Sequence, residues 1–179
     1  MHQNFRGKYE VELKFRIQDI VSFRESLFSH HPESFVFENK EHDIYYDAAD
    51  KSLARKNISM FLRRMAPSGI NLWIVKGPSM RRRETVNVES FDMTDSMLRT
   101  LGFQPIFEVN KTRSIYFLER FHITLDYIAS LGHFVEISCM TEDEAELDIL
   151  GERCTDCGLR LGLNMDNIET RSYRQMLGY

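Results

Sequence analysis

Residues 8–17 read Lys-Tyr-Glu-Val-Glu-Leu-Lys-Phe-Arg-Ile, and this stretch alternates strictly between charged and apolar side chains. The odd positions from Tyr9 to Ile17 are apolar, whereas the even positions from Lys8 to Arg16 are charged. Because successive side chains of a β-strand point to opposite sides, this period of two predicts a strand with one apolar and one charged face. The strand therefore needs a core on one side and either solvent or a polar ligand on the other.

Strand patterns dominate the rest of the chain as well. Strand-like segments follow at about residues 42–47, 58–65, 70–76, 82–90, 106–117, 121–128 and 133–140. Helices are expected after the N-cap residue Asp19, at about residues 94–101, and from the capping-box pattern Thr141–Glu144 to about residue 157. The order lacks the βαβ alternation of a Rossmann or TIM fold. We therefore predict an α+β fold, a closed antiparallel eight-stranded barrel with peripheral helices.

Charged residues recur among apolar residues on the same face of several strands. Lys111 and Arg113 share a face with Val109 and Ile115, and Glu136 lies within an otherwise apolar strand. A charge in such a place is costly unless it is paired or hydrated in a functional cavity. We therefore expect these side chains to line the lumen of the barrel, which is wide enough for one small ligand.

The expected lumen combines two kinds of charge. Its cations are Lys8, Lys14, Arg63, Lys76, Arg82, Lys111 and Arg113, and its carboxylates are Glu10, Glu12, Glu84, Asp126 and Glu136. Cations bind phosphate oxygens, and carboxylates are oxygen ligands for a hard divalent cation. The pattern indicates phosphoryl-group chemistry with a divalent metal.

The overall composition narrows the classes of partner and compartment. The chain of 179 residues has 23 Lys and Arg against 27 Asp and Glu, a formal net charge of −4. Binders of nucleic acid or anionic membranes carry an excess of basic residues, so neither partner is expected. The segment Met1–Lys14 has no apolar signal sequence, and no run approaches the ~20 apolar residues of a membrane span.

The cysteines point to the same compartment. Cys139, Cys154 and Cys157 are odd in number and give no disulfide framework, so we expect a cytoplasmic protein. The pair Cys154-x-x-Cys157 has no second Cys or His pair nearby, as a zinc site would need. We interpret it as two small buried residues on one helix face.

The spacing of the charged residues resembles a known superfamily. Glu10-x-Glu12-x-Lys14 matches an ExExK signature. It is followed in order by Leu62-Arg63, Trp73-Ile-Val-Lys76-Gly-Pro, Arg82-x-Glu84, Lys111-x-Arg113, Leu125-Asp126 and Phe134-x-Glu136-Ile. The chain resembles the CYTH superfamily, the triphosphate tunnel metalloenzymes, and especially the bacterial class IV adenylyl cyclases. It departs from the usual pattern at Met65, where a second arginine is common, and at Ser138, where an acidic residue is frequent.

This resemblance implies a single CYTH domain over residues 1–179 that converts ATP to 3′,5′-cyclic AMP and pyrophosphate with Mg²⁺ or Mn²⁺. It assigns the triphosphate to Lys8, Lys14, Arg63, Lys76, Arg82, Lys111 and Arg113. It assigns the metal to Glu10, Glu12, Glu136 and Asp126. It gives catalytic roles to Lys14, Arg63, Lys111, Arg113 and Asp126. Family analogy also allows a homodimer.

Two alternative functions remain open at this point. A site that aligned water instead of the ribose 3′-hydroxyl would hydrolyse thiamine triphosphate, inorganic tripolyphosphate or a nucleoside triphosphate. A site without turnover would be a non-catalytic organophosphate-binding module. The fold does not decide between these chemistries.

Three other features have structural interpretations. Of Arg81, Arg82 and Arg83, we expect only Arg82 inside the barrel, because alternate residues of a strand share a face. Trp73 is expected to pack on the outside of the barrel beneath a helix. We interpret His122, on the same face as Asp126, as a satisfied or partly exposed histidine.

Overall fold

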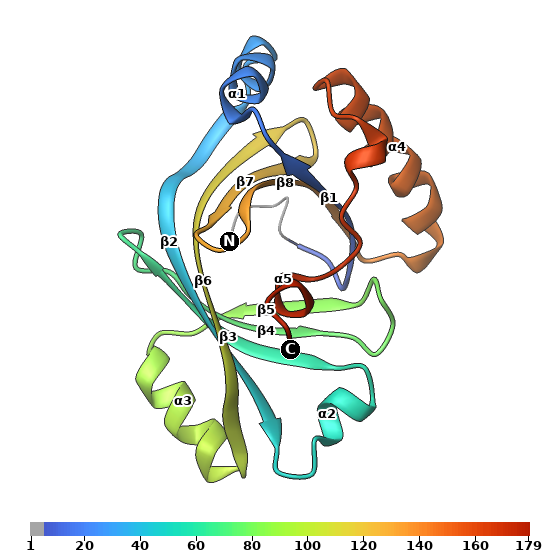
Figure 1. The fold of residues 1–179 in the computed structure, drawn as a ribbon. Coiled ribbons are helices and arrows are strands. Elements are labelled where there is room, and N and C mark those ends of the chain that lie inside the picture. Colours follow the sequence, from blue (N-terminus) through green and yellow to red (C-terminus); the bar gives the residue numbers. More distant parts are fainter. Residues whose placement is uncertain (1–5) are drawn as a thin grey trace.

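In the computed structural model, which describes residues 6–179, eight antiparallel strands form one curled sheet (Figure 1). The strands are β1 (Tyr9–Ile17), β2 (Glu33–Ala48), β3 (Ser59–Ala66), β4 (Asn71–Lys76), β5 (Arg83–Asn87), β6 (Phe103–Leu118), β7 (Phe121–Ile128) and β8 (Gly132–Thr141). The helices are α1 (Ile20–Ser29), α2 (Ser52–Arg55), α3 (Phe91–Thr100), α4 (Leu147–Arg160) and α5 (Tyr173–Met176). The first five residues of the segment Met1–Lys14, in which we looked for a targeting signal, lie outside the described residues.

The sheet is an open half-barrel, which corrects the closed barrel expected from the sequence. Its order, β1-β8-β7-β6-β2-β3-β4-β5, places β1 and β5 at opposite edges. These edges meet at an isolated bridge between Tyr9 and Arg82, where the Glu10 amide donates to the Arg81 carbonyl at 2.7 Å. Strand β5 has five residues and β1 has nine, and no ladder joins the two strands among the described residues. Alternation predicts which face a residue takes, but closure depends on strand length and stagger as well.

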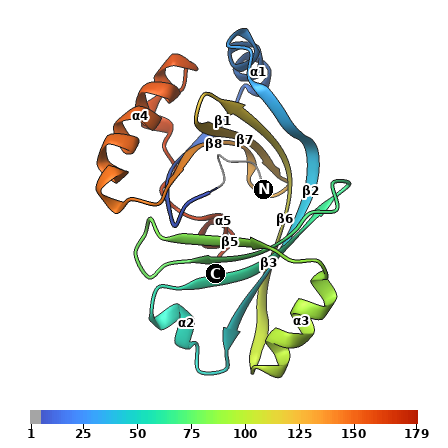
Figure 2. The same ribbon diagram turned by 180° about the vertical axis from the view of Figure 1, so that it is seen from behind.

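Helices cover the convex face of the sheet, as the two opposite views show (Figures 1 and 2). Helix α4 packs on β1 and β8, and the apolar side chains Val11 and Phe15 of β1 lie in one core cluster with Leu150 of α4. Cys154 and Cys157 are buried in the same cluster, which confirms their structural interpretation. Among residues 6–179, no helix is long and apolar enough to span a membrane.

A second cluster lies beneath α3 at the other end of the convex face. Phe91 and Leu98 of α3 pack there with Leu62, and Trp73 lies against the cluster from β4. Trp73 thus packs outside the sheet beneath a helix, as we predicted. In β1, β3 and β4 the apolar residues of these two clusters thus lie on the convex side, and the charged residues that alternate with them lie on the concave side.

The element boundaries agree with the sequence at the start of α1 but differ from it at α3 and β2. The Asp19 side chain accepts hydrogen bonds from the backbone of Val21 and Ser22, so it caps α1 as predicted. Helix α3 is capped by Ser90 and begins at Phe91, three residues before the predicted start. Strand β2 is much longer than the predicted 42–47, because residues 33–41 also pair with β6.

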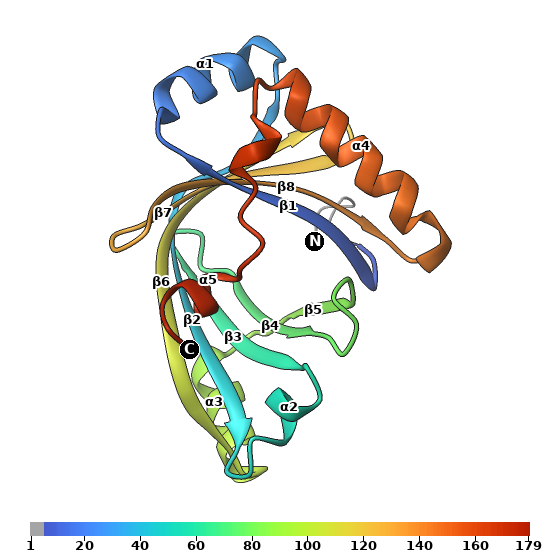
Figure 3. The same ribbon diagram turned by 45° about the vertical axis from the view of Figure 1, so that its right-hand side comes forward.

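The C-terminal segment turns into the concave side of the sheet, where α5 lies between its two halves (Figure 3). A capping box between Ser172 and Gln175 begins this short helix. The Tyr173 ring is buried and meets Phe134 of β8 edge to face, with 5.3 Å between ring centroids. The segment therefore covers one end of the concavity and supplies side chains to it.

We predict that Gly77 is required for the hairpin that presents Lys76. Its φ is +105°, and a Cβ atom there would lie 2.1 Å from the backbone oxygen of Asn57. Gly77→Ala should lower the free energy of unfolding by about 3 kcal/mol or more, as measured by urea denaturation. Gly69→Ala is the control, since its φ is +71° but no atom lies within 4 Å of the added Cβ. This control should lose about 1–2 kcal/mol from backbone conformation alone, and equal losses would contradict the steric argument.

Candidate active site

Strand register brings charged residues from most of the sheet onto one concave face. Lys14 pairs with Glu136, Arg63 with Asp43, and Arg113 with Asp126. Directly opposed residues of antiparallel strands project to the same side, so these charges meet inside the curl. The predicted residues that the structure brings together here are Glu10, Glu12, Lys14, Arg63, Lys76, Lys111, Arg113, Asp126 and Glu136.

Two adjoining cavities lie within this face. The larger compartment, of about 230 Å³, has apolar walls from Phe35, Met65, Ile70, Leu72, Ile115 and Met140 and polar or charged groups from Glu10, Glu41, Thr85, Asn87, His122, Thr124 and Ser138. The cationic compartment, of about 120 Å³, is lined by Lys14, Arg63, Lys76, Arg83, Lys111, Arg113 and Arg174, with Asp43, Tyr45, Ser59, Phe61, Ser172 and Tyr173. Glu12, Arg63, Arg83, Arg113 and Glu136 line both and mark the junction.

On the β2 side, Asp43 holds the guanidinium of Arg63 in a two-pronged hydrogen bond. The Arg63 Nε and Nη2 atoms donate to the two Asp43 oxygens at 2.7 and 2.8 Å. The Lys111 ammonium lies 3.6 Å from the same carboxylate. Burial alone would raise the pKa of Asp43, but Arg63 and Lys111 outweigh it and lower the pKa to about 2. Asp43 is therefore an anion that fixes two cations, and it was not among the predicted site residues.

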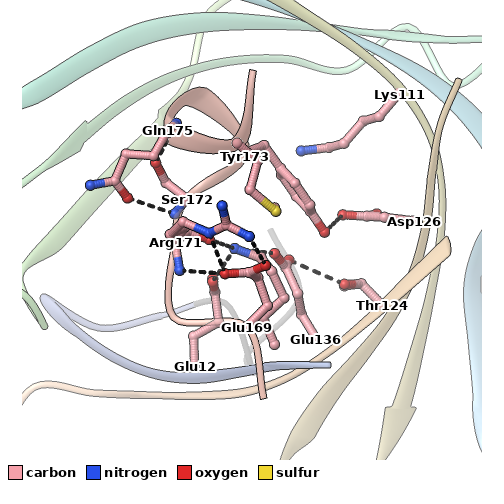
Figure 4. Close-up of polar contacts among 12 residues, drawn as sticks. Glu12, Lys111, Thr124, Asp126, Glu136, Glu169, Arg171, Ser172, Tyr173 and Gln175 are labelled. Carbon is pink, nitrogen blue, oxygen red and sulfur yellow. Dashed lines mark hydrogen bonds and ion pairs between the residues drawn. The ribbon is translucent and has the colours of Figure 1, made fainter. Parts of the chain in front are cut away.

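On the β7 and β8 side, Asp126 holds Arg113 in the same way. The Arg113 guanidinium donates to both Asp126 oxygens and to Glu136. The Tyr173 hydroxyl also donates to Asp126, at 2.7 Å, as Figure 4 shows. Burial raises the pKa of Tyr173 well above its ordinary value, and the Asp126 charge adds to this effect. Both Asp126 oxygens are engaged, and this residue lines neither compartment. Asp126 thus positions Arg113, and we remove it from the predicted metal ligands.

At the β5 edge the structure corrects the register by one residue. Arg83, not Arg82, lines both compartments and forms an ion pair with Glu10. Arg82 instead pairs with Glu84 at 2.9 Å outside the site. The cause is that β5 begins at Arg83, which is paired with Lys76 across the hairpin and so takes the inner face with it. Glu84 takes the outer face for the same reason.

The side chain of Glu10 links the β1 edge of the sheet to residues of β4 and β5 at the opposite edge. Its carboxylate contacts Arg83 and lies 3.3 Å from the Lys76 ammonium. Burial alone would raise the pKa of Glu10, but Arg83 and Lys76 together lower it to about 2. Lys8, which was also predicted to face the lumen, lies before β1, and its side chain is 57% exposed. Its ammonium lies 3.9 Å from the Glu142 carboxylate. It therefore lies outside both compartments.

Glu12 and Glu136 have the donor chemistry for a hard divalent cation. Both line both compartments, and the Lys14 ammonium lies between them, 3.8 Å from Glu12 and 3.5 Å from Glu136. Within residues 6–179 no group of three or more acidic, His or Cys side chains converges as a complete metal cage. Mg²⁺ is commonly held by one or two carboxylates together with substrate phosphates and water, so this pair fits such an ion.

Several site residues escaped the sequence analysis. Glu41 and Asp43 are buried on the inner face of β2, but they lie in an almost wholly polar run that hides the period of two. Arg83 was assigned to the wrong face, and Tyr173 lies in a tail with no strand pattern. Asp47, in contrast, accepts hydrogen bonds from the backbone at the start of α2 and has a structural role. The strand register places Asp43 opposite Arg63 and Glu41 opposite Lys111, but no apolar alternation in the sequence marks this face of β2.

His122 lines the larger compartment together with Met65 and Ser138, the two residues that depart from the usual pattern of the family. The His122 ring is buried, with its Nδ1 atom 3.4 Å from the Ser138 hydroxyl. Ser138 occupies the inner position two residues after Glu136, and Met65 occupies the inner position two residues after Arg63. These replacements make the larger compartment less charged than the cationic one.

Comparison with known proteins shows a consistent set of relatives. The CYTH domain family matches residues 8–173. An adenylate cyclase, CyaB, from Aeromonas hydrophila is 44% identical over 97% of this chain and 91% of its own length. A structure from Vibrio parahaemolyticus, provisionally called an adenylate cyclase, superposes with a TM-score of 0.94 at 37% identity, covering 97% of this chain and 100% of that one.

A more distant structure shares the fold. It is a Hippeastrum protein with a dominant triphosphatase activity, with a TM-score of 0.63 at 15% identity over 93% of this chain and 94% of that chain.

Proposed function

We propose that this chain, which belongs to the CYTH domain family, is an adenylate cyclase. It would convert ATP to 3′,5′-cyclic AMP and pyrophosphate. The observation that carries this proposal is the pair of joined compartments, one cationic and one largely apolar. A nucleoside triphosphate has the same two parts. The adenylate cyclase name of a relative that is 44% identical over 97% of the chain supports the reaction.

We assign the triphosphate to the cationic compartment. The residues proposed to bind it are Lys14, Arg63, Lys76, Arg83, Lys111 and Arg113. All six side chains line that compartment, and Arg63, Arg83 and Arg113 also reach its junction with the larger one. The adenosine would then occupy the larger compartment, whose apolar walls suit a flat heterocycle and whose polar side chains could bind the ribose or the base.

The reaction requires the ribose 3′-oxygen to attack the α-phosphorus while pyrophosphate leaves from the opposite side. Placing the phosphates in one compartment and the nucleoside in the other brings the ribose to the junction between them. Arg63, Lys111 and Arg113 would stabilise the negative charge that develops on the leaving pyrophosphate. These cations are oriented beforehand by Asp43 and Asp126, so little rearrangement is needed at the moment of reaction.

Glu12 and Glu136, with Glu10 beside them, would hold Mg²⁺ or Mn²⁺, which supplies further positive charge to the phosphate oxygens when bound. Lys14 lies between Glu12 and Glu136 and would bind a phosphate oxygen beside this ion. The Glu12 side chain is 25% exposed and lines both compartments, so its oxygens are accessible from either one.

The proposed setting follows the sequence analysis. Three free, buried cysteines suit a reducing compartment, so we place the enzyme in the cytoplasm. Its partner is ATP, not a nucleic acid or a membrane, and a homodimer remains a prediction from family analogy.

Incubation of the pure protein with ATP and Mg²⁺ or Mn²⁺ tests the proposal. We expect cyclic AMP and pyrophosphate in equal amounts, separated and quantified by ion-exchange chromatography. ADP and phosphate would instead favour the triphosphatase alternative, and the absence of any product would favour a binding module. Failure to form cyclic AMP while a triphosphate is readily hydrolysed would contradict the proposal.

The corrected register of β5 gives a second prediction. Arg83→Gln should raise the KM for ATP about tenfold or more, because a charged donor that lines both compartments is lost. Arg82→Gln removes the same charge one residue earlier but outside the site, and its KM should stay within about twofold. Steady-state kinetics of the two variants provides the measurement. A larger effect from Arg82 than from Arg83 would restore the original register.

A further inference from the structure

Glu41 stands apart from the other carboxylates of the site in the kind of contact it makes. It lies on β2, with a side chain 0% exposed, between the cations of β3 and β6. One of its oxygens, Oε2, lies 3.0 Å from Arg63, 3.3 Å from Lys111 and 3.8 Å from Arg113. Yet neither oxygen has a hydrogen-bond partner among the described residues. Glu41 therefore supplies negative charge to three cations at once without orienting any of them by a hydrogen bond.

The three cations do not need Glu41 for their orientation. Arg63 is held by the two hydrogen bonds that it donates to Asp43, and Arg113 is held by those that it donates to Asp126. Lys111 keeps Asp43 as a second partner at 3.6 Å. Removing only the charge of Glu41 should thus leave the arrangement of the cations intact. What would change is the net charge that they present to an anion.

We propose that Glu41 acts as an internal competitor for pyrophosphate and so allows this product to leave. The idea rests on the proposed function, because pyrophosphate is its expected product. Each phosphate oxygen that binds Arg63, Lys111 or Arg113 must share that cation with the Glu41 carboxylate. Because Arg63, Lys111 and Arg113 are buried, a negative charge within 4 Å of them weakens anion binding strongly. Without the Glu41 charge, the same cations would hold pyrophosphate more tightly and release it more slowly.

Glu41→Gln is the direct test, since it keeps the shape of the side chain and removes its charge. We expect this variant to bind inorganic pyrophosphate about tenfold or more tightly than the wild type, as measured by calorimetry in EDTA. Glu41→Asp, which keeps the charge, should bind with nearly wild-type affinity. Asp148→Asn, which removes a charge from a side chain 97% exposed on α4, should leave the affinity unchanged. Unchanged or weaker binding by Glu41→Gln, or equal tightening by Asp148→Asn, would overturn the proposal.

Comparing the single-turnover rate with the steady-state kcat separates a role in product release from a structural role. In Glu41→Gln the single-turnover rate with ATP should stay within about threefold of the wild type, while the steady-state kcat falls about tenfold or more because release becomes slow. An equal fall in both rates would overturn the proposal, since Glu41 would then act on the chemical step.

The variant is purified in the presence of pyrophosphate, because three buried cations lose part of their compensation without Glu41. If it unfolds on removal of the anion, urea denaturation across a range of pyrophosphate concentrations gives the affinity instead. Because the binding measurements need no turnover, they separate this proposal from the proposed function. Absence of cyclic AMP would refute the proposed function. The pyrophosphate affinities of the variants test the role of Glu41 independently of that function.

Discussion

The two-pronged bond between Arg113 and Asp126, with Glu136 on the same guanidinium, ties together the parts of the molecule that form the site. It links β6, β7 and β8, and the Tyr173 hydroxyl attaches the C-terminal segment to the same carboxylate. A buried arginine without these partners would be strongly destabilising. The matching pair of Arg63 and Asp43 does the same for β2 and β3. The curl of the sheet and the cover at one end of its concavity thus depend on paired charges as much as on the apolar clusters of the convex face.

The alternation seen in residues 8–17 was sufficient to predict much of the fold. It correctly predicted which residues of β1 face the core and which face the concavity, because a strand offers only two sides. The predicted closure of the barrel was wrong: the two edges meet at a single bridge just before the short strand β5, and strand length was not evident among residues 82–90. The first part of β2, residues 33–41, was not predicted as a strand for a different reason. Polar residues at both inner and outer positions leave no alternation to detect around Glu41.

The same limits explain the site. Cations that stand beside apolar neighbours, such as Lys111 and Arg113, were placed correctly. Arg83 was missed because in a run of three arginines the sequence carries no signal for the register, which the hairpin at Gly77 decides. Asp126 was predicted on the correct face, yet its role depends on which donors reach it, and this is a property of tertiary structure. The result is a site whose cations are already paired with protein carboxylates, so that a triphosphate replaces existing partners instead of entering an uncompensated cavity.

The central claim, that these concave-face cations form one site for a polyphosphate chain, is tested most directly by urea denaturation with inorganic tripolyphosphate in EDTA. The account predicts that stability rises with the logarithm of tripolyphosphate concentration, with a slope that fits one bound ligand, and that added salt reduces the effect. Inorganic monophosphate at equal ionic strength should stabilise far less. An unfolding midpoint that does not move with tripolyphosphate, or moves equally with monophosphate, would contradict the account.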